Sequence, residues 1–246
     1  MSYAINQGTR IHYEIVGMGE PLVLQHGWIL EGGQWRQDGY VSPLSERYRV
    51  ILVDMRGHGQ SDKPHDGASY ALNTLVTDVV AVLDDAGVQR AHYWGYSMGG
   101  WIGLGLLTQA GHRLNKAILG GTHPYGRKAT PFTSDGSDAQ QFMREVWKRF
   151  GVDFDSLPLE LRKKLLAADC RALAVAQQDR ASQESLLPNV STPCLMYAGA
   201  DDGLFAQAQN GARLMPNCKF ITVPGTHFEA NQNASAILPE ALKFLG

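Results

Sequence analysis

The sequence has few of the features that mark secreted or membrane proteins. It contains three cysteines in 246 residues, Cys170, Cys194 and Cys218, and these cannot all pair with one another. Because two of them stand in apolar, strand-like surroundings, we interpret them as reduced core residues of a cytosolic protein. No stretch approaches the about 18 consecutive apolar residues of a transmembrane helix, and the first residues lack the basic and apolar regions of a signal peptide. We therefore expect a cytoplasmic location and no membrane partner.

Basic runs and the common metal and nucleotide motifs are also absent. The 22 lysines and arginines are scattered and the formal net charge is -2, so we expect no nucleic-acid partner. The sequence contains no H-E-x-x-H motif, no paired C-x-x-C motifs, and neither the Walker nor the Rossmann glycine pattern. We therefore expect no metal and no cofactor, with water as the co-substrate of an enzyme. No pattern specifies the oligomeric state, for which we expect a monomer or a homodimer.

What recurs along the chain is a short apolar run followed by a helical stretch. Residues 11–16 alternate between apolar and polar side chains, which predicts a strand of an edge hairpin. Continuous apolar runs, typical of parallel strands buried on both faces, occur at 21–26, 50–54, 91–95, 117–120, 194–199 and 220–223. Helices are predicted between or after them at 34–44, 74–86, 98–109, 204–214 and 234–244. This alternation predicts a doubly wound α/β sheet with right-handed crossovers.

One interval, residues 123–188, breaks this rhythm because it shows no strand signal. Phe142, Val146 and Phe150 recur there at helical spacing, and leucines do so further on. We interpret the interval as a helical insertion into a core formed by residues 1–122 and 189–246. It is either a pair of ordinary surface helices or a cap over the carboxyl ends of the strands, where ligands bind in such sheets. We favour the cap, because both ends of the insertion must leave from that edge.

The segment Gly95-Tyr-Ser97-Met-Gly99 matches the motif G-x-S-x-G. With 27 glycines in the chain, this match alone could arise by chance. Its setting is more specific, because a predicted buried strand precedes it directly and a predicted helix rich in Gly, Leu and Ile follows it. Side chains larger than glycine two residues before or after the serine would collide with the strand or the helix. We predict that Ser97 is a nucleophile; the alternative is an inert serine in a glycine-rich turn.

A serine hydroxyl needs a base to become a nucleophile, and the base needs an orienting partner. At sites of this kind the acid and then the histidine follow the serine along the chain. Three histidines follow Ser97. We expect His112 on the wrong side of the sheet, and His123 precedes every candidate acid. We therefore choose His227, after the last predicted strand, as the base; the alternative is a histidine on a surface loop.

The acid is expected at the end of the strand that precedes the last one. Asp201 and Asp202 follow the predicted strand at 194–199, and only one of them can lie beside the imidazole of His227. We choose Asp202, with Asp201 as the alternative. Glu229 is a more remote candidate, because it is too close to His227 in the sequence to face it easily. A carboxylate here would hold the histidine tautomer and stabilise the imidazolium.

The tetrahedral intermediate of acyl transfer needs hydrogen-bond donors aimed at its oxyanion. We predict that the backbone N–H groups of Met98, directly after the serine, and of Trp28, in the loop after the strand at 21–26, supply them. Gly27 would allow the tight turn that this loop needs. His26 is expected to brace the loop rather than to take part in the chemistry.

For the substrate pocket, the sequence offers mainly apolar candidates. We predict substrate contacts from Trp28, His123, Phe142 and Trp147, although apolar residues at helical spacing are more often core.

Five segments together resemble the α/β-hydrolase superfamily: His26-Gly-Trp28, Asp54-Met-Arg-Gly-His-Gly-Gln-Ser61, Gly95-Tyr-Ser-Met-Gly-Gly100, Gly199-Ala-Asp-Asp202 and Gly225-Thr-His227. The resemblance implies a mostly parallel, twisted, eight-stranded sheet with helices on both faces and a small helical cap. In the family pattern G-x-x-D the acid comes last, which supports Asp202. The family's D-x-R-G-x-G-x-S loop lies near the site and is structural. The chain length and the H-G-W loop are similar to small bacterial carboxylesterases, including those acting on pimeloyl-type esters.

The predicted function is therefore the hydrolysis of small-molecule carboxylic esters through an acyl-enzyme intermediate. The same fold and residues also serve lactone hydrolysis, C–C bond hydrolysis and cofactor-free perhydrolase or haloperoxidase reactions. C–C cleavage would use further polar groups, for which His123 and Tyr125 are candidates; the alternative role for both is at the hinge of the cap. A small-molecule receptor on the same fold is a third hypothesis. Relatives with an aspartate nucleophile are disfavoured by Ser97.

Overall fold

The structure, a computed structural model, describes residues 2–246 and contains one eight-stranded sheet. The strands are β1 (Ser2–Asn6), β2 (Thr9–Val16), β3 (Glu20–Gln25), β4 (Tyr48–Val53), β5 (Ala91–Tyr96), β6 (Leu114–Gly120), β7 (Cys194–Gly199) and β8 (Cys218–Val223). Their order in the sheet is β1-β2-β4-β3-β5-β6-β7-β8. β2 is antiparallel to β1 and to β4, and every other pair is parallel. This topology confirms the predicted α/β-hydrolase fold.

The first two strands form an antiparallel hairpin at one edge of the sheet. Residues 11–16 lie in its inner strand, β2, which pairs with β1 on one side and with β4 on the other, so the predicted strand of an edge hairpin is confirmed. The edge strand is β1, which no sequence signal indicated. Within β1 only Ala4 is buried, so this strand has almost none of the apolar pattern by which strands are recognised.

Ten α-helices accompany the sheet in the described residues. They are α1 (Gln34–Gln37), α2 (Val41–Ser45), α3 (Leu72–Asp85), α4 (Met98–Gln109), α5 (Ala139–Arg149), α6 (Leu159–Leu166), α7 (Cys170–Ala176), α8 (Phe205–Ala212), α9 (His227–Gln232) and α10 (Ala234–Leu245). Short 3-10 helices lie at η1 (Gly67–Tyr70), η2 (Gly111–Arg113), η3 (Phe154–Ser156) and η4 (Glu184–Asn189). None of the helices in residues 2–246 has the length and apolar character needed to cross a membrane.

Helices predicted within the α/β core agree with the structure except in one region. The predicted helix at 34–44 is two helices, α1 and α2. Gly39 separates them with φ +85°, a left-handed conformation that ends a helix and that glycine adopts at little cost. The helix α9 was not predicted, because six residues are too few to show a helical period.

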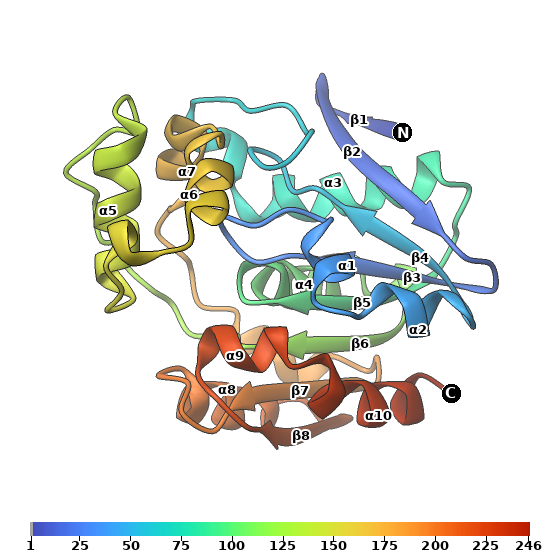
Figure 1. Cartoon of the computed structure of the whole chain (residues 1–246). Helices are drawn as coiled ribbons and strands as arrows, with labels where there is room; N and C mark the ends of the chain where they lie inside the picture. Colours follow the sequence, from blue (N-terminus) through green and yellow to red (C-terminus); the bar gives the residue numbers. More distant parts are fainter. Residues whose placement is uncertain (1) are drawn as a thin grey trace.

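Helices cover both faces of the sheet (Figure 1). On each face, an apolar cluster of side chains lies between the sheet and the helices. Val23 of β3 packs in one cluster with side chains of α3, α4 and α8. Its neighbours Leu22 and Leu24 point to the opposite face and pack with side chains of α1, α2 and α10. The alternation follows from the two-residue period of a strand. In the strand order, β3 and β5 are neighbours in the middle of the sheet.

The segment 123–188 lies between β6 and β7 and contains α5, α6, α7, η3 and η4. It has an apolar cluster of its own, which includes Phe142, Val146, Phe154 and Leu173 and also Ile29 from the loop after β3. Figure 1 shows α5, α6 and α7 beyond the edge of the sheet toward which the arrows of β4 and β6 point. The segment therefore lies at the carboxyl ends of the parallel strands.

Candidate active site

Ser97 occupies the single residue between the end of β5 and the start of α4. Its backbone has φ 54° and ψ −111°, a conformation that costs a residue with a side chain about 1–3 kcal/mol. Hydrogen bonds on both sides hold this strained turn: the Ser97 N–H donates to Gly120 O at 2.8 Å, and Ser97 O accepts from Trp101 N–H at 2.9 Å. The turn lifts the side chain away from the strand and toward the carboxyl edge.

Steric contacts explain why the motif has glycine on both sides of Ser97. A Cβ atom on Gly95 would lie 2.4 Å from Gly99 O, and one on Gly99 would lie 2.3 Å from Gln25 O. Both contacts are with backbone atoms, which cannot move aside as a flexible side chain can. The close approach of α4 to β3 and β5 therefore requires glycine at both positions.

His227 is the first residue of α9, and its imidazole faces Ser97. Its Nε2 lies 3.0 Å from Ser97 Oγ, and its Nδ1 lies 2.8 Å from Asp202 Oδ2. Two residues before the helix, Gly225 has φ +97°, which turns the chain after β8 back toward β5. Glu229 does not reach the imidazole, because its carboxylate accepts from Thr226 N–H and Thr226 Oγ–H at 2.9 Å and so caps α9.

Asp202 follows β7 and is buried, with 6% of its surface exposed, whereas Asp201 is exposed. Its Oδ1 accepts from Leu204 N–H at 2.8 Å while Oδ2 faces His227. Burial raises the pKa of Asp202, but the hydrogen bonds from His227 and Leu204 outweigh it and hold the pKa below the usual value of an aspartate. An ionised Asp202 accepts a hydrogen bond from the Nδ1–H group of His227, which leaves Nε2 unprotonated and able to take the proton of Ser97 Oγ.

Two backbone N–H groups lie beside Ser97 without a protein acceptor. Within residues 2–246, neither Trp28 N–H nor Met98 N–H donates to a protein atom. Met98 is the first residue of α4, where helix N–H groups have no partner within the helix. Trp28 follows Gly27, whose Cα is so near the serine that an added Cβ would lie 3.3 Å from Ser97 Cβ. Both N–H groups are therefore available to an oxygen bound near Ser97.

Two buried histidines brace the loop that carries Trp28. His26 Nε2 accepts from Met55 N–H at 3.0 Å, and His58 Nε2 accepts from Ile29 N–H at 3.3 Å. Burial lowers the pKa of His26 and lowers that of His58 to about 3. Both rings are thus neutral at neutral pH, which is the form that can accept these bonds. The loop after β3 is fixed by this pair, as expected for His26.

A cavity of about 580 Å³ opens at Ser97 between the carboxyl edge of the sheet and the 123–188 segment. We call it the Ser97 cavity. Its floor includes Ser97, Asp202, His227 and the loop at Gly27–Leu30. The lining from the 123–188 segment consists of His123, Tyr125, Arg127, Thr130, Phe132, Val146, Arg149, Phe150, Gln177 and Arg180. The cavity therefore combines apolar walls with three arginines.

The structure brings two of the four predicted substrate contacts to this cavity and not the other two. Trp28 and His123 line it. Phe142 is fully buried beneath the lining, with its ring 4.8 Å from that of Phe132. Trp147 stacks on Phe228 with the ring centres 5.8 Å apart and is not among the lining residues. Phe142 thus packs inside the 123–188 segment, whereas Trp147 packs the segment against α9.

A model described as alpha/beta hydrolase fold matches residues 20–169 of the sequence, more than half of the chain. The chain belongs to the α/β-hydrolase fold family. This α/β hydrolase is 26% identical over 263 residues to a putative non-heme chloroperoxidase from Synechocystis sp., covering 96% of this chain and 94% of that protein. It is 36% identical over 138 residues to a pimeloyl-[acyl-carrier protein] methyl ester esterase from Nitrosomonas europaea. That match covers 55% of this chain and 51%, about half the length, of the relative.

Solved structures resemble this α/β hydrolase over its whole length. The esterase RhEst1 from Rhodococcus sp. ECU1013 superposes with a TM-score of 0.80 at 27% identity, covering 99% of this chain and 97% of that chain. The match includes the sheet and the segment between β6 and β7. The family assignment thus rests on the sequence and the fold together.

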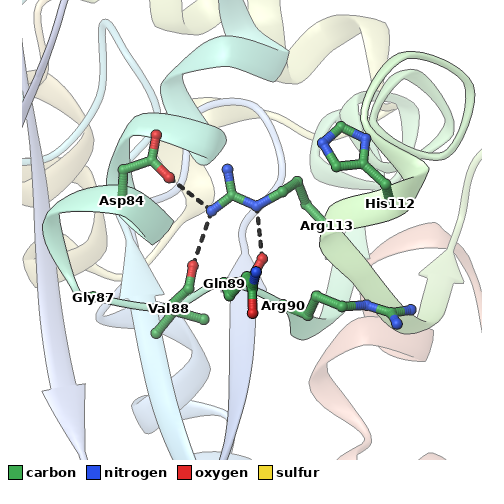
Figure 2. Close-up of a pocket in the computed structure, with 7 residues that line it drawn as sticks. All are labelled: Asp84, Gly87, Val88, Gln89, Arg90, His112 and Arg113. Carbon is green, nitrogen blue, oxygen red and sulfur yellow. Dashed lines mark hydrogen bonds and ion pairs between the residues drawn. The ribbon is translucent and has the colours of Figure 1, made fainter.

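A second hollow lies at the opposite edge of the sheet in this α/β hydrolase (Figure 2). It is lined by Asp84, Gly87, Val88, Gln89, Arg90, His112 and Arg113. Its most buried charge is tied to the protein: Arg113 Nη2 donates to Asp84 Oδ1 at 2.7 Å and to Val88 O at 2.9 Å. Sequence reasoning had no reason to select this hollow, and no group in it corresponds to a nucleophile with a base.

Proposed function

We propose that this α/β hydrolase cleaves carboxylic esters of small molecules through an acyl-enzyme intermediate on Ser97. The observation that carries the proposal is the unbroken chain of hydrogen bonds from Ser97 Oγ to His227 and from His227 to Asp202, at 3.0 and 2.8 Å. Ser97, at one end of this chain of hydrogen bonds, lines a cavity of about 580 Å³, which is large enough for a small ester. The esterases among the similar proteins support the same reaction.

In the first half of the reaction, Ser97 Oγ attacks the carbonyl carbon of the ester. His227 Nε2 takes the hydroxyl proton, and the imidazolium that forms is stabilised by Asp202. The carbonyl oxygen becomes an oxyanion, which accepts from Trp28 N–H and Met98 N–H. The intermediate then collapses: the bond to the leaving alcohol breaks, and the alcohol oxygen takes the proton from Nε2. The acyl group remains bound to Ser97.

In the second half, a water molecule takes the place of the alcohol. His227 Nε2 removes one proton from the water, whose oxygen attacks the acyl carbon and forms a second oxyanion at the same two N–H groups. Collapse breaks the bond to Ser97 Oγ, which recovers its proton from Nε2 and releases the acid. In this proposal the 123–188 segment is a cap. Its side chains shield the acyl-enzyme from bulk solvent and limit the size and shape of the substrates that fit the cavity.

A second candidate is C–C bond hydrolysis on the same residues. It is favoured by His123, whose Nδ1 is buried without a hydrogen-bond partner in the described residues, and by Tyr125, which stacks on His123 with the ring centres 5.8 Å apart. Both line the Ser97 cavity and could protonate or orient a carbon leaving group. Turnover of a vinylogous diketone that exceeds turnover of p-nitrophenyl esters would select this reaction over ester hydrolysis.

The test of the main proposal is a series of p-nitrophenyl esters of increasing acyl length, assayed with wild type and with Ser97→Ala. We expect a sharp optimum in kcat/KM at short to medium acyl chains, set by the apolar walls of the cavity. Ser97→Ala should lower kcat by about 10⁴- to 10⁶-fold. Wild type that is inactive on every ester, or Ser97→Ala with undiminished activity, would overturn the proposal.

A further inference from the structure

Two of the arginines in the Ser97 cavity are held directly opposite each other. The 123–188 segment pairs with itself at one isolated antiparallel bridge, in which Arg127 N–H donates to Arg180 O at 2.9 Å and Arg180 N–H donates to Arg127 O at 2.8 Å. Opposite residues of an antiparallel pair carry their side chains on the same face. Both side chains line the cavity. Like charges at opposite positions destabilise a pair of strands, so the fold gains no stability from this placement.

Neither of these arginines is neutralised by the protein. Among residues 2–246, no carboxylate forms an ion pair with Arg127 or Arg180; Arg127 donates to the neutral amide oxygen of Gln177 at 2.8 Å. The guanidinium of Arg180 lies over the indole of Trp101, 4.4 Å from the ring centre. Burial and the charge of Arg127 lower the pKa of Arg180 to about 9, so it is still cationic at neutral pH.

The third arginine of the cavity provides a contrast. Arg149 forms an ion pair with Glu145 at 2.9 Å and donates to the backbone oxygens of Thr130 and Pro131 at 2.8 and 2.7 Å. Its charge and its donors are therefore used within the protein. Lys128, next to Arg127 in the sequence, likewise pairs with Asp179. The absence of a partner is specific to Arg127 and Arg180 in this part of the segment.

No other group of the cavity can act as the missing anion. Asp202 is the one carboxylate among the described residues that line it, and both of its oxygens accept bonds from His227 and Leu204. His123 adds a further ring nitrogen, Nδ1, without a partner in the described residues. Burial lowers the pKa of His123, and the charges of Arg180 and Arg127 lower it further. This end of the cavity thus has cationic donors in excess and lacks an acceptor.

The arginines also lie close to the reacting serine. Trp101, which supports Arg180, is one helical turn after Ser97, and its N–H donates to Ser97 O at 2.9 Å. Ser97 and Arg180 also line the same cavity of about 580 Å³, so one small molecule can reach both. Guanidinium groups present paired donors that match the two oxygens of a carboxylate. Arg180 is half-buried and Arg127 is exposed, so an anion bound between them would offset the partial desolvation of the Arg180 charge.

We propose that the substrate carries a free carboxylate, bound by Arg180 and Arg127, so that the preferred class is a half-ester of a dicarboxylic acid or a lactone with a carboxylate substituent. This inference rests on the proposed function, because it assigns specificity to the ester that Ser97 attacks. It makes Arg180 and Arg127 specificity-determining residues. A phosphate group would offer the same oxygens to the arginines, and the test below separates the two.

The experiment compares kcat/KM for monomethyl and dimethyl esters of the same C4–C8 dicarboxylic acids. Since a hydrogen bond to a charged group contributes about 1.5–3 kcal/mol, we expect wild type to prefer the charged half-ester by about 10- to 100-fold. Arg180→Met should bring this ratio close to one, and Arg180→Lys should restore part of it. Arg149→Met is the matched control, because its charge lines the same cavity but is neutralised by Glu145; it should keep the wild-type ratio. If Arg180→Met does not fold, Arg127→Gln serves in its place.

A binding measurement keeps the two proposals apart. Ser97→Ala should bind succinate, glutarate or adipate in calorimetry, and adding Arg180→Met should weaken the binding about 10-fold or more. Neutral and charged esters hydrolysed equally well through Ser97 would overturn the carboxylate assignment and leave the esterase proposal in place. Dicarboxylate binding through Arg180 without hydrolysis of any ester would overturn the esterase proposal and support the carboxylate site. Tighter binding of inorganic phosphate or of phosphate monoesters than of dicarboxylates would overturn the assignment to a carboxylate.

Discussion

The two hollows of this α/β hydrolase lie at opposite edges of one sheet and differ in where their polar groups find partners. In the hollow of Figure 2, Arg113 uses its donors on Asp84, Val88 and Gln89, at distances of 2.7 to 2.9 Å. Each contact joins two parts of the chain, and the result is a closed network that contributes to stability.

The Ser97 cavity shows the opposite arrangement. Trp28 N–H and Met98 N–H have no protein acceptor in the described residues, and Arg180 has no counter-ion. Ser97 itself is held at a positive φ of 54°. Unpaired donors and backbone strain lower the stability of the free protein, so they are expected mainly where they contribute to ligand binding or catalysis. Their concentration at the carboxyl edge, and not at the edge of Figure 2, is the reason why we propose the Ser97 cavity, and not the hollow, as the site that binds a ligand.

The sharpest test of this contrast is Asp202→Asn beside Asp201→Asn. An asparagine at 202 still accepts from Leu204 N–H, but it can no longer hold the tautomer of His227 and stabilise its positive charge. We expect kcat on esters to fall by about 10⁴-fold in Asp202→Asn. Asp201 is exposed, and the carboxylate that is hydrogen-bonded to the imidazole is that of Asp202, so Asp201→Asn should keep kcat within about twofold of wild type. Equal losses in the two variants would contradict the assignment.

The next test uses pH to probe the histidines that brace the Trp28 loop. The pKa of His58 is about 3 in the folded state and about 6.5 in the unfolded chain. Between pH 6.5 and pH 3, His58 is therefore protonated in the unfolded state but neutral in the folded state. As a result, the free energy of unfolding falls as the pH drops toward 3. The slope due to this group is at most about 1.4 kcal/mol per pH unit.

Denaturant unfolding of wild type and His58→Gln between pH 7 and pH 4 measures this slope. We expect the variant to be less stable at pH 7 and to lose less stability as the pH is lowered. His112, an exposed histidine of the hollow in Figure 2, supplies the control: His112→Gln should follow the wild-type curve. Parallel curves for wild type and His58→Gln would show that His58 does not stay neutral on folding.

A third test addresses the close packing beneath Ser97. A Cβ on Gly99 would lie 2.3 Å from Gln25 O, whereas one on Gly203 would meet no atom within 4 Å. Gly99→Ala should lower the free energy of unfolding by about 1–3 kcal/mol, the usual cost of overpacking. It should also lower kcat, because α4 and the elbow must shift. Gly203→Ala should change the unfolding free energy by less than about 0.5 kcal/mol. Thermal and denaturant unfolding of both variants would decide the matter.

The smallest effect is expected at the other edge of the sheet. Arg113→Met removes the closed network of Figure 2 and should lower the free energy of unfolding by about 1 kcal/mol, with kcat/KM on esters unchanged. The pair Asp84 and Arg113 is partly exposed, which limits its contribution. A loss of esterase activity in Arg113→Met without loss of stability would break the distinction between the two hollows.

Much of the fold could be predicted because its signals are local. Strand patterns and the glycines around Ser97 are readable within a few residues of each position, and the order of serine, aspartate and histidine along the chain is readable without knowledge of the fold. The strand β1 was missed because only Ala4 in it is buried. Phe142 and Trp147 were predicted to contact substrate, but helical spacing cannot distinguish a side chain facing a cavity from one facing its own segment.

The arginines of the cavity could not be selected from the sequence. Arg127 and Arg180 meet through one backbone bridge between loops that are far apart in the chain. No local pattern marks either residue, and their missing counter-ions are visible only when every neighbouring carboxylate has been placed. The proposed specificity thus depends on two arginines that only the fold brings together, whereas the proposed chemistry depends on residues in recognisable sequence motifs.

The central claim is that Ser97 is a nucleophile activated by His227, and covalent trapping tests it most directly. Wild type would be treated with a p-nitrophenyl phosphonate and the modified peptide identified by mass spectrometry, with Ser97→Ala and His227→Ala in parallel. We predict one phosphonyl group per chain on Ser97, no labelling of Ser97→Ala, and a labelling rate in His227→Ala lowered by about 10³-fold or more. An unlabelled wild type, or a label on another residue that persists in Ser97→Ala, would contradict the account.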